Sequence, residues 1–274
     1  MQRTVISIDT IKWALRPLYR VVQWVGHAFG YRLSVTVTPV PRRGWGSPPP
    51  AAPDAGSVRA RLYGRDPFEG FPTDAYAADL RGWHSTHPIF EQAILAVRPT
   101  TIIEVGSWKG ASAVHMATIC RRHGLGCEIV CVDTWLGSSE HLLSRGDEFD
   151  LRFRHGYPQI YYVFMANVIA SGFAGCICPL PNTSENAHHV LKQLGVQAGI
   201  VYVDAAHHYA SVWNDLQAYW ELLTENGLLI GDDYEWDDVA RAARDFAESV
   251  GRPLEVHGSK YVIHRGASAS HGAR

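Results

Sequence analysis

Three aspartates follow two apolar segments of the chain and could together hold a metal ion. Asp204 follows residues 200–203, and Asp232 and Asp233 follow residues 228–231. If the two segments are neighbouring parallel strands, their carboxyl ends meet at one edge of a sheet. Carboxylates held that close repel one another unless a cation lies between them, and a set of oxygen ligands suits Mg²⁺. We favour a magnesium site over the alternative, in which these aspartates cap the following helices.

A histidine lies three residues beyond the first of these aspartates. His207 is expected on the loop that follows the strand, close to the proposed ion. A neutral imidazole near pH 7 is a good acceptor for a hydroxyl proton, which makes His207 the candidate general base. A structural role is the alternative for His207 and is the role that we assign to His208.

A glycine-containing turn supplies a second candidate site. Gly106 and Gly110 separate the apolar residues 101–105 from a helical pattern that begins at Ala111. Gly106 allows a sharp turn at the end of a strand, and Gly110 allows a ligand or backbone to approach the free N–H groups of the helix start. Asp133 ends the next apolar segment, where an acid can bind the two hydroxyls of a ribose. An ordinary strand–helix turn is the alternative.

The elements that would position these residues alternate between strand and helix. Apolar segments predict strands over residues 101–105, 128–133, 175–178, 199–203 and 227–231. Helical periodicity predicts helices over residues 111–122, 159–171, 184–194, 212–223 and 236–250. A hairpin with Gly258 and Ser259 at its turn follows. The pattern predicts an α/β fold with a mainly parallel sheet, one antiparallel edge and helices on both faces.

The first 75 residues differ from the rest of the chain. Apolar residues at steps of three and four predict an amphipathic helical segment within residues 1–45, followed by a short strand. Peripheral contact of residues 10–29 with an anionic membrane surface is one interpretation. We favour the other, a helix that docks on its own domain or on a second subunit of a homo-oligomer. A Pro/Ala-rich linker (46–75), a folded domain (76–266) and a flexible tail (267–274) complete the predicted organisation.

Composition argues against several classes of protein. The formal net charge of -2 gives no sign of a nucleic-acid-binding surface. The five cysteines lack C-x-x-C spacing, so we expect reduced thiols. No apolar run is long enough to cross a bilayer, and the first residues lack the features of a secretory signal. We therefore expect a cytoplasmic protein, located peripherally at the inner membrane face if residues 10–29 bind lipid.

The glycine turn and the acids together resemble a known family. The turn reads E-V-G-S-W-K-G over residues 104–110, a G-x-x-x-G spacing rather than the G-x-G-x-x-G of dinucleotide folds. With V-D-T-W-L-G (132–137), D-A-A-H (204–207) and G-D-D (231–233), it resembles class I S-adenosylmethionine-dependent methyltransferases. Residues 83–265 look closest to the metal-dependent sugar O-methyltransferases of the macrocin and mycinamicin type. That group commonly has D-A-S-H where this chain has D-A-A-H.

The resemblance implies a Rossmann-like sheet of seven strands and a role for each motif. The turn would contact the methionine part of the cofactor, Asp133 the ribose, and Thr183 and Ser184 the adenine. The implied cofactor-binding residues are Glu104, Gly106, Ser107, Gly110, Ser112, Asp133, Thr134, Thr183, Ser184 and Asp204. Asp204, Asp232 and Asp233 would bind Mg²⁺, and His207 would act as the base.

These features predict a Mg²⁺-dependent O-methyltransferase that moves a methyl group from S-adenosylmethionine to a hydroxyl of a sugar or glycosylated metabolite. Methyl transfer is an in-line displacement at a sulfonium, so the enzyme contributes mostly placement and activation of the hydroxyl. The same fold acting on a small catechol-like phenol is the nearest alternative. A nicotinamide-dependent oxidoreductase and a non-catalytic cofactor-binding subunit are the alternatives from other classes.

Overall fold

The computed structural model describes residues 56–144 and 149–266. The predictions for residues 1–45, for the first part of the linker (46–55) and for the tail 267–274 lie outside these ranges. Within them, no helix is both long and apolar enough to cross a membrane.

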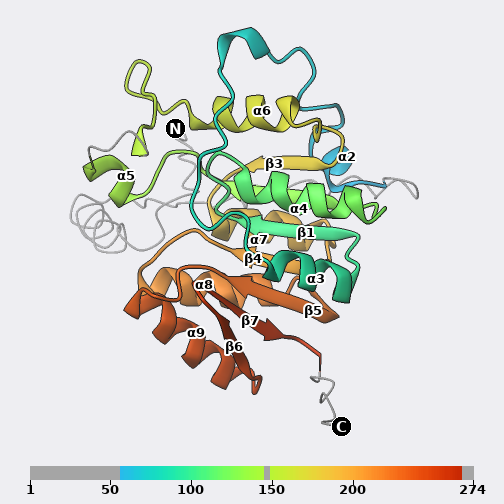
Figure 1. The fold of residues 1–274 in the computed structure, drawn as a ribbon, viewed down its shortest axis with the longest axis vertical. Coiled ribbons are helices and arrows are strands. Elements are labelled where there is room, and N and C mark those ends of the chain that lie inside the picture. The colour runs from blue at the N-terminus through green and yellow to red at the C-terminus, as the bar shows by residue number, and fades with distance from the viewer. Residues whose placement is uncertain (1–55, 145–148, 267–274) are drawn as a thin grey trace, which may run out of the picture. The chain divides into compact units, whose positions relative to one another are not determined.

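Seven strands form one sheet in the order β3-β2-β1-β4-β5-β7-β6 (Figure 1). The strands are β1 (Thr101–Val105), β2 (Glu128–Asp133), β3 (Ile177–Pro181), β4 (Ala198–Val203), β5 (Leu223–Gly231), β6 (Leu254–His257) and β7 (Lys260–His264). β1 to β5 run parallel, and β7 pairs antiparallel with both β5 and β6. This topology confirms the predicted fold class, including the antiparallel hairpin at the end of the domain.

Helices cover both faces of the sheet, and the buried side chains form two separate layers. One layer contains residues of α3 (Ile89–Val97), α4 (Ala111–Arg122) and α6 (Ile160–Ala170). The other contains residues of α2 (Val58–Tyr63), α7 (Ser184–Gln193), α8 (Tyr209–Trp220) and α9 (Asp237–Ser249). Two short helices, η1 (Thr73–Ala75) and α5 (Ser139–Leu143), lie outside these layers.

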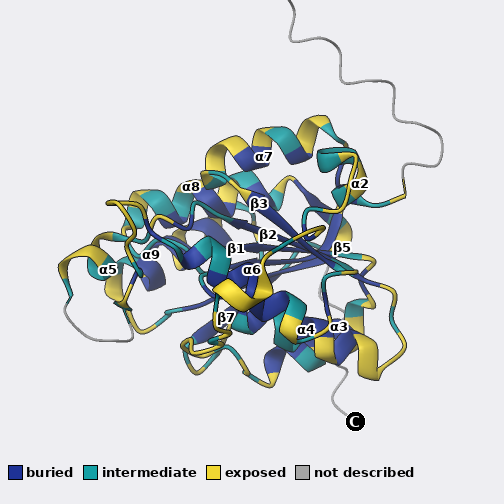
Figure 2. Ribbon diagram, turned by 90° about the horizontal axis from the view of Figure 1, so that it is seen from above, coloured by how far each residue is buried: buried dark blue, intermediate teal, exposed yellow. Residues whose placement is uncertain are grey.

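The parallel strands are mostly apolar because both of their faces are covered. Every residue of β4 is buried, as are the four central residues of β2 (Figure 2). Such strands appear in a sequence as continuous apolar runs, and this is why their positions could be predicted. The edge strand β6 shows the opposite pattern, with Glu255 and Val256 exposed.

The third strand differs from the prediction. It runs over Ile177–Pro181 instead of residues 175–178, and it includes Pro179 and Pro181. β3 is the outermost strand of the sheet and pairs only with β2. A proline in an edge strand can turn its missing N–H away from the ladder, so the two prolines do not end the strand as they would in the centre of a sheet.

The stretch predicted as a linker contains a helix that packs on the domain. The N–H groups of Val58 and Arg59, at the start of α2, donate to the Glu128 carboxylate at 2.6 and 2.9 Å. The Tyr63 hydroxyl donates to the carbonyl oxygen of Pro179 at 2.5 Å. An acid at a helix N-terminus satisfies N–H groups that have no partner within the helix. Residues 58–63 are therefore attached to the sheet at β2 and β3.

Gly106 makes the tightest backbone approach in the turn, and this leads to a stability prediction. A Cβ atom at Gly106 would lie 1.9 Å from the carbonyl oxygen of Asp204, and the residue has φ +87°. Because the opposing atom is backbone, we expect Gly106→Ala to lower the free energy of unfolding by at least about 3 kcal/mol. Gly195→Ala is the matched control, since Gly195 also has positive φ but no atom within 4 Å of the added Cβ.

For the control we expect a loss of only about 1 kcal/mol, from the left-handed backbone conformation alone. Urea unfolding of the two variants measures both values. Equal losses would show that the contact with Asp204 imposes no special requirement.

Candidate functional site

Backbone hydrogen bonds join the carboxyl ends of four strands. Gly106 N–H donates to Val132 across β1 and β2 at 2.8 Å, and Asp204 N–H donates to Val105 across β4 and β1 at 2.7 Å. Asp232 N–H donates to the carbonyl of Val203 at 3.1 Å. The glycine turn and the acidic strand ends are thereby held side by side at one edge of the sheet, as the sequence predicts.

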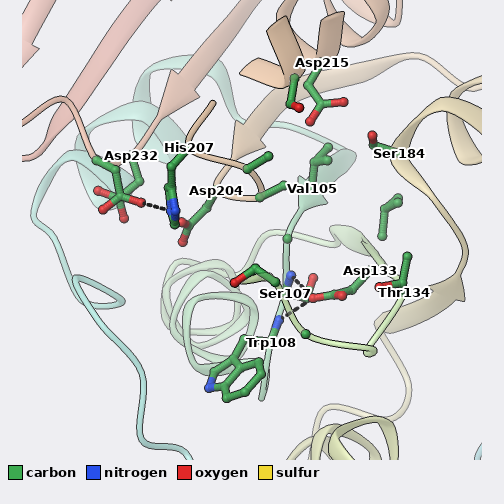
Figure 3. Close-up of a pocket in the computed structure, with 18 of the residues that line it drawn as sticks. Val105, Ser107, Trp108, Asp133, Thr134, Ser184, Asp204, His207, Asp215 and Asp232 are labelled. Atoms are coloured by element: carbon green, nitrogen blue, oxygen red, sulfur yellow. Dashed lines mark hydrogen bonds and ion pairs between the residues drawn. The ribbon is translucent and has the colours of Figure 1, made fainter. Parts of the chain in front are cut away.

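A cavity of about 1130 Å³ lies at this edge. Pockets for drug-sized ligands measure about 300–1,000 Å³, so there is room for a cofactor and an acceptor together. Asp133 and Thr134 lie at one side of it, and Asp204, His207 and Asp232 gather at the other (Figure 3). The predicted site residues that line it are Gly106, Ser107, Ser112, Asp133, Thr134, Thr183, Ser184, Asp204, His207, Asp232 and Asp233.

Glu104 and Gly110 do not line this cavity but shape the turn from beneath. The Glu104 carboxylate is fully buried and accepts hydrogen bonds from the hydroxyls of Ser107 at 2.6 Å and Ser112 at 2.5 Å. Burial raises the pKa of Glu104. A Cβ atom at Gly110 would lie 2.8 Å from the ring of Phe164, so this glycine is required for packing against α6.

Asp133 holds the glycine turn through its carboxylate. One oxygen accepts the N–H groups of Ser107 at 3.0 Å and Trp108 at 2.8 Å, and the other accepts the N–H of Trp135 at 2.7 Å. Burial raises the pKa of Asp133, and these N–H donors oppose that effect. Each carboxylate oxygen has two lone pairs, so the oxygen bound to Trp135 can still accept a hydroxyl.

A second anchor of the turn was not predicted from the sequence. The Lys109 ammonium is almost fully buried and pairs with Asp79 at 2.9 Å. Arg152 and Arg81 also bind Asp79, and the hydrogen bond from Arg81, together with Lys109, holds the pKa of Asp79 well below its usual range. Asn167 of α6 donates to the carbonyl oxygens of both Asp79 and Lys109. The segment before α3 is therefore tied to the turn.

At the acidic side of the cavity, Asp232 is engaged by donors from β7 and β4. Lys260 is completely buried, and its ammonium lies 2.5 Å from Asp232 Oδ2. The Ser259 hydroxyl donates to Asp232 Oδ1 at 3.0 Å. The Tyr202 hydroxyl, which accepts from Lys260 at 3.0 Å, lies 2.8 Å from Asp204 and 2.9 Å from Asp232. A lysine 28 residues further along the chain thus neutralises one of the three aspartates.

The surroundings of Asp204 disfavour its charged form. Burial raises the pKa of Asp204 to about 8, and the charges of Asp232 and Asp233 add to the effect. Lys260 opposes the shift but does not cancel it. Without a cation beside it, the Asp204 carboxyl is therefore mostly protonated near neutral pH.

Asp233 is paired with the histidine. It has φ +58°, in the left-handed region. Its Oδ2 atom lies 2.9 Å from His207 Nε2, and the His207 ring stacks on Trp236 at 4.7 Å. The hydrogen bond to Asp233 raises the pKa of His207, while burial opposes this. Within the described residues, His207 Nδ1 has no hydrogen-bond partner.

Two residues beside Asp233 were also missed. His84, from the loop before α3, has its Nδ1 atom 3.8 Å from Asp232 Oδ1 and 4.0 Å from Asp233 Oδ1. His84, Asp233 and Glu235 each offer a ligand atom, and these atoms lie within 4.8 Å of one another. All three residues line the cavity. A histidine about 150 positions before the aspartates gives no local signal, and only the folded chain shows this relation.

Comparison with known proteins gives the class. Residues 103–234 match the family model described as a methyltransferase domain. Solved structures similar to this chain include an O-methyltransferase from Bacillus cereus in complex with SAH, at 12% identity over 69% of this chain and 82% of that chain, with a TM-score of 0.47. The calicheamicin methyltransferase CalS11 matches at 18% identity over 65% and 76%, with a TM-score of 0.49. Cofactor-bound Rv0187 from MTB matches at 16% identity over 76% and 94%, with a TM-score of 0.48.

No curated protein sequence matches the chain. Residues 103–234, which match the methyltransferase domain model, span the glycine turn, Asp133 and the acidic strand ends. This confirms the prediction of an enzyme of the S-adenosylmethionine-dependent methyltransferase class, and it argues against the oxidoreductase.

The contacts of Asp133 lead to a binding prediction. Asp133→Ala removes the acceptor of three backbone N–H groups and the proposed partner of the ribose. Hydrogen bonds to charged groups contribute about 1.5–3 kcal/mol, so we expect S-adenosylhomocysteine to bind about 10–100-fold more weakly. Isothermal titration calorimetry measures this, with the exposed Asp74→Ala as the control. Unchanged affinity in Asp133→Ala would remove the ribose assignment.

The pairing of Asp79 leads to a pH-dependent stability prediction. Asp79→Asn leaves the buried Lys109 ammonium without its countercharge, which we expect to cost about 3 kcal/mol at pH 7. Because the pKa of Asp79 is lowered in the folded state, its contribution is present above the unfolded pKa of about 4 and is lost as the pH falls further. The difference in unfolding free energy between wild type and variant should therefore shrink below about pH 4. A difference that stays constant with pH would contradict the ion pair.

Proposed function

We propose that the protein is an S-adenosylmethionine-dependent O-methyltransferase that acts on a hydroxyl of a sugar or glycosylated metabolite. The observation that carries the proposal is the Asp233–His207 pair, which faces the same cavity as the glycine turn. A carboxylate that binds one ring nitrogen fixes the tautomer, which leaves the other nitrogen as the proton acceptor. With Nε2 bound to Asp233, Nδ1 of His207 is left for that role; Nδ1 is buried and has no partner among the described residues, so the ring must move for Nδ1 to meet the acceptor hydroxyl.

The chemical step follows from this arrangement. The acceptor oxygen attacks the methyl carbon of the sulfonium, the carbon–sulfur bond breaks, and S-adenosylhomocysteine leaves as the thioether. The hydroxyl proton passes to His207, and Asp233 stabilises the imidazolium that forms. Ser107, Asp133 and Thr134 bind and orient the donor, and Thr183 and Ser184 contact the adenine. Orientation of the two reactants supplies most of the rate increase.

A divalent cation, Mg²⁺ in the prediction from the sequence, is part of the proposal. The carboxylates of Asp232 and Asp233 lie close enough to Asp204 to raise its pKa, and a cation between them would relieve that repulsion. The fit is uneven, because Asp204 is bound to Tyr202 and Asp232 to Lys260, whereas Asp233 has an oxygen on the side of the cavity near His84. When bound, the ion would lower the pKa of the acceptor hydroxyl. The proton transfer described above is performed by the side chains themselves.

The mouth of the cavity favours a sugar over a small phenol. Trp83 and Trp236 both line the cavity, and each is almost half exposed, at 46% and 47%. Exposed indole faces can pack against the C–H face of a sugar while their edges remain in water. A catechol-like phenol would favour a narrow slot closed by aromatic rings. The macrocin-type group that the motifs resemble fits the sugar hypothesis.

An acceptor panel tests the proposal. S-adenosylhomocysteine release should be seen with glycosides or nucleotide sugars and not with catechols, and preference for catechols would support the alternative acceptor. His207→Ala should lower turnover by about 10²–10⁴-fold, the range for loss of a general base. The affinity for S-adenosylhomocysteine should stay within about twofold, because His207 contacts the acceptor side. The adjacent, exposed His208→Ala is the matched control and should turn over normally; wild-type turnover in His207→Ala would return His207 to a structural role.

A further inference from the structure

We infer that the cation of this site is bound by His84, Asp233 and Glu235, and not by the three aspartates together. The inference rests on the proposed function and changes two of the three ligands expected from the sequence. It makes the site a mixed nitrogen and oxygen site in place of an all-oxygen one.

The first step concerns Asp204 and Asp232, which already have partners. Asp204 accepts a hydrogen bond from the Tyr202 hydroxyl at 2.8 Å. Asp232 is 4% exposed and binds Lys260 through Oδ2 and Ser259 through Oδ1. Lys260 is held in place by its contacts with the rings of Phe90 at 5.0 Å and Tyr202 at 4.8 Å. A buried ammonium beside a carboxylate supplies the positive charge that a metal ion would otherwise bring. Asp232 is thus neutralised inside the protein.

The second step concerns the outer groups, which lack such partners. Among the residues that the structure describes, the Glu235 carboxylate makes no hydrogen bond or ion pair, and His84 meets Asp232 and Asp233 only at 3.8 and 4.0 Å. Asp233 uses Oδ2 for His207, which leaves Oδ1 on the side of His84. Carboxylates that bind metal ions are themselves supported by hydrogen bonds, as Asp233 is by His207.

The third step is the spacing of the ligand atoms. One atom each from His84, Asp233 and Glu235 lies within 4.8 Å of the others. Ligand atoms about 2.1 Å from one ion lie about 3.0 Å apart when cis and about 4.2 Å apart when trans, so shifts of about 1 Å in the side chains would let all three reach it. His84 and Glu235 are both exposed, and their side chains are free to make that adjustment.

The donor set determines which ion fits. Carboxylates suit Mg²⁺, Ca²⁺ and Mn²⁺, whereas imidazole nitrogen suits first-row transition ions. A set of one imidazole and two carboxylates should therefore favour Mn²⁺, a transition ion that also accepts oxygen ligands, over Mg²⁺. The ion would also lie next to the base, because Asp233 would bind the ion through Oδ1 while its Oδ2 binds His207. Asp233 therefore connects the cation site with the proton acceptor.

Metal titrations on the full chain test the inference without relying on turnover. Mn²⁺ alone is titrated into EDTA-treated protein, with free Mn²⁺ followed by electron paramagnetic resonance and Mg²⁺ used as competitor. Wild type should bind one Mn²⁺ more tightly than Mg²⁺. His84→Ala and Glu235→Gln should each weaken Mn²⁺ binding by at least about 10-fold, and His84→Ala should also remove the preference over Mg²⁺.

Two controls locate the site. His87→Ala removes a histidine of the same loop whose Nδ1 accepts the N–H of Ile89, and it should not change Mn²⁺ affinity. Asp204→Asn should keep Mn²⁺ affinity within about twofold under this proposal, whereas it should abolish binding if the three aspartates hold the ion. Loss of binding in Asp204→Asn with full binding in His84→Ala would overturn the inference, as would wild type that binds no Mn²⁺ at millimolar concentration.

S-adenosylhomocysteine binding and acceptor turnover in EDTA are measured on the same samples. If both persist while Mn²⁺ fails to bind, the cation site is wrong and the methyltransferase function stands. If S-adenosylhomocysteine fails to bind, the proposed function fails independently of the metal.

Discussion

The close backbone contact between Gly106 and Asp204 is the constraint on which the whole site depends. The carbonyl oxygen of Asp204 occupies the space where any other residue at position 106 would place its Cβ atom. Together with the N–H of Asp204 bound to Val105, this contact locks the ends of β1 and β4 against each other. A ligand that lies across Gly106 therefore meets Asp133 on one side and Asp204 on the other. The main chain sets that geometry, which leaves the side chains to decide the chemistry.

The carboxylates on the two sides of the cavity have different kinds of partner. On the donor side, Asp133 is bound by backbone N–H groups and Glu104 by hydroxyls, so both are fixed by neutral donors. On the acceptor side, Lys260 neutralises Asp232 from behind, and Asp233 and Glu235 are left facing the open cavity. The donor is a sulfonium cation, and the hydroxyl must lose a proton. In the proposed function, negative charge on this side would attract the sulfonium, and Asp233 would stabilise the imidazolium that forms when His207 takes the proton.

Much of this edge could be predicted because it depends on local patterns. Buried parallel strands are continuous apolar runs, and the acids that follow them mark the ends of the strands. The roles of individual acids could not be predicted in the same way. Asp232 and Asp233 are adjacent in sequence, yet Asp232 binds Lys260 and Asp233 binds His207. Lys260 and His84 reach the same acids from a hairpin and a loop, and no spacing rule connects such distant positions. Glu104 and Gly110 were placed in the right turn, but their contacts are with Ser107, Ser112 and Phe164, beneath the surface that a cofactor would touch.

The segment before α3 connects the two sides of the cavity. Asp79 anchors its start to Lys109 of the glycine turn, and a few residues later the same segment supplies Trp83 and His84 to the acceptor side. Trp83 in turn contacts Trp108, which is held by Asp133. The turn around Asp133 and the wall that carries Trp83 and His84 are therefore joined by two separate contacts, the Asp79–Lys109 ion pair and the ring contact of Trp83 with Trp108. In the proposed function, these contacts would couple the order of the donor side to the shape of the acceptor side.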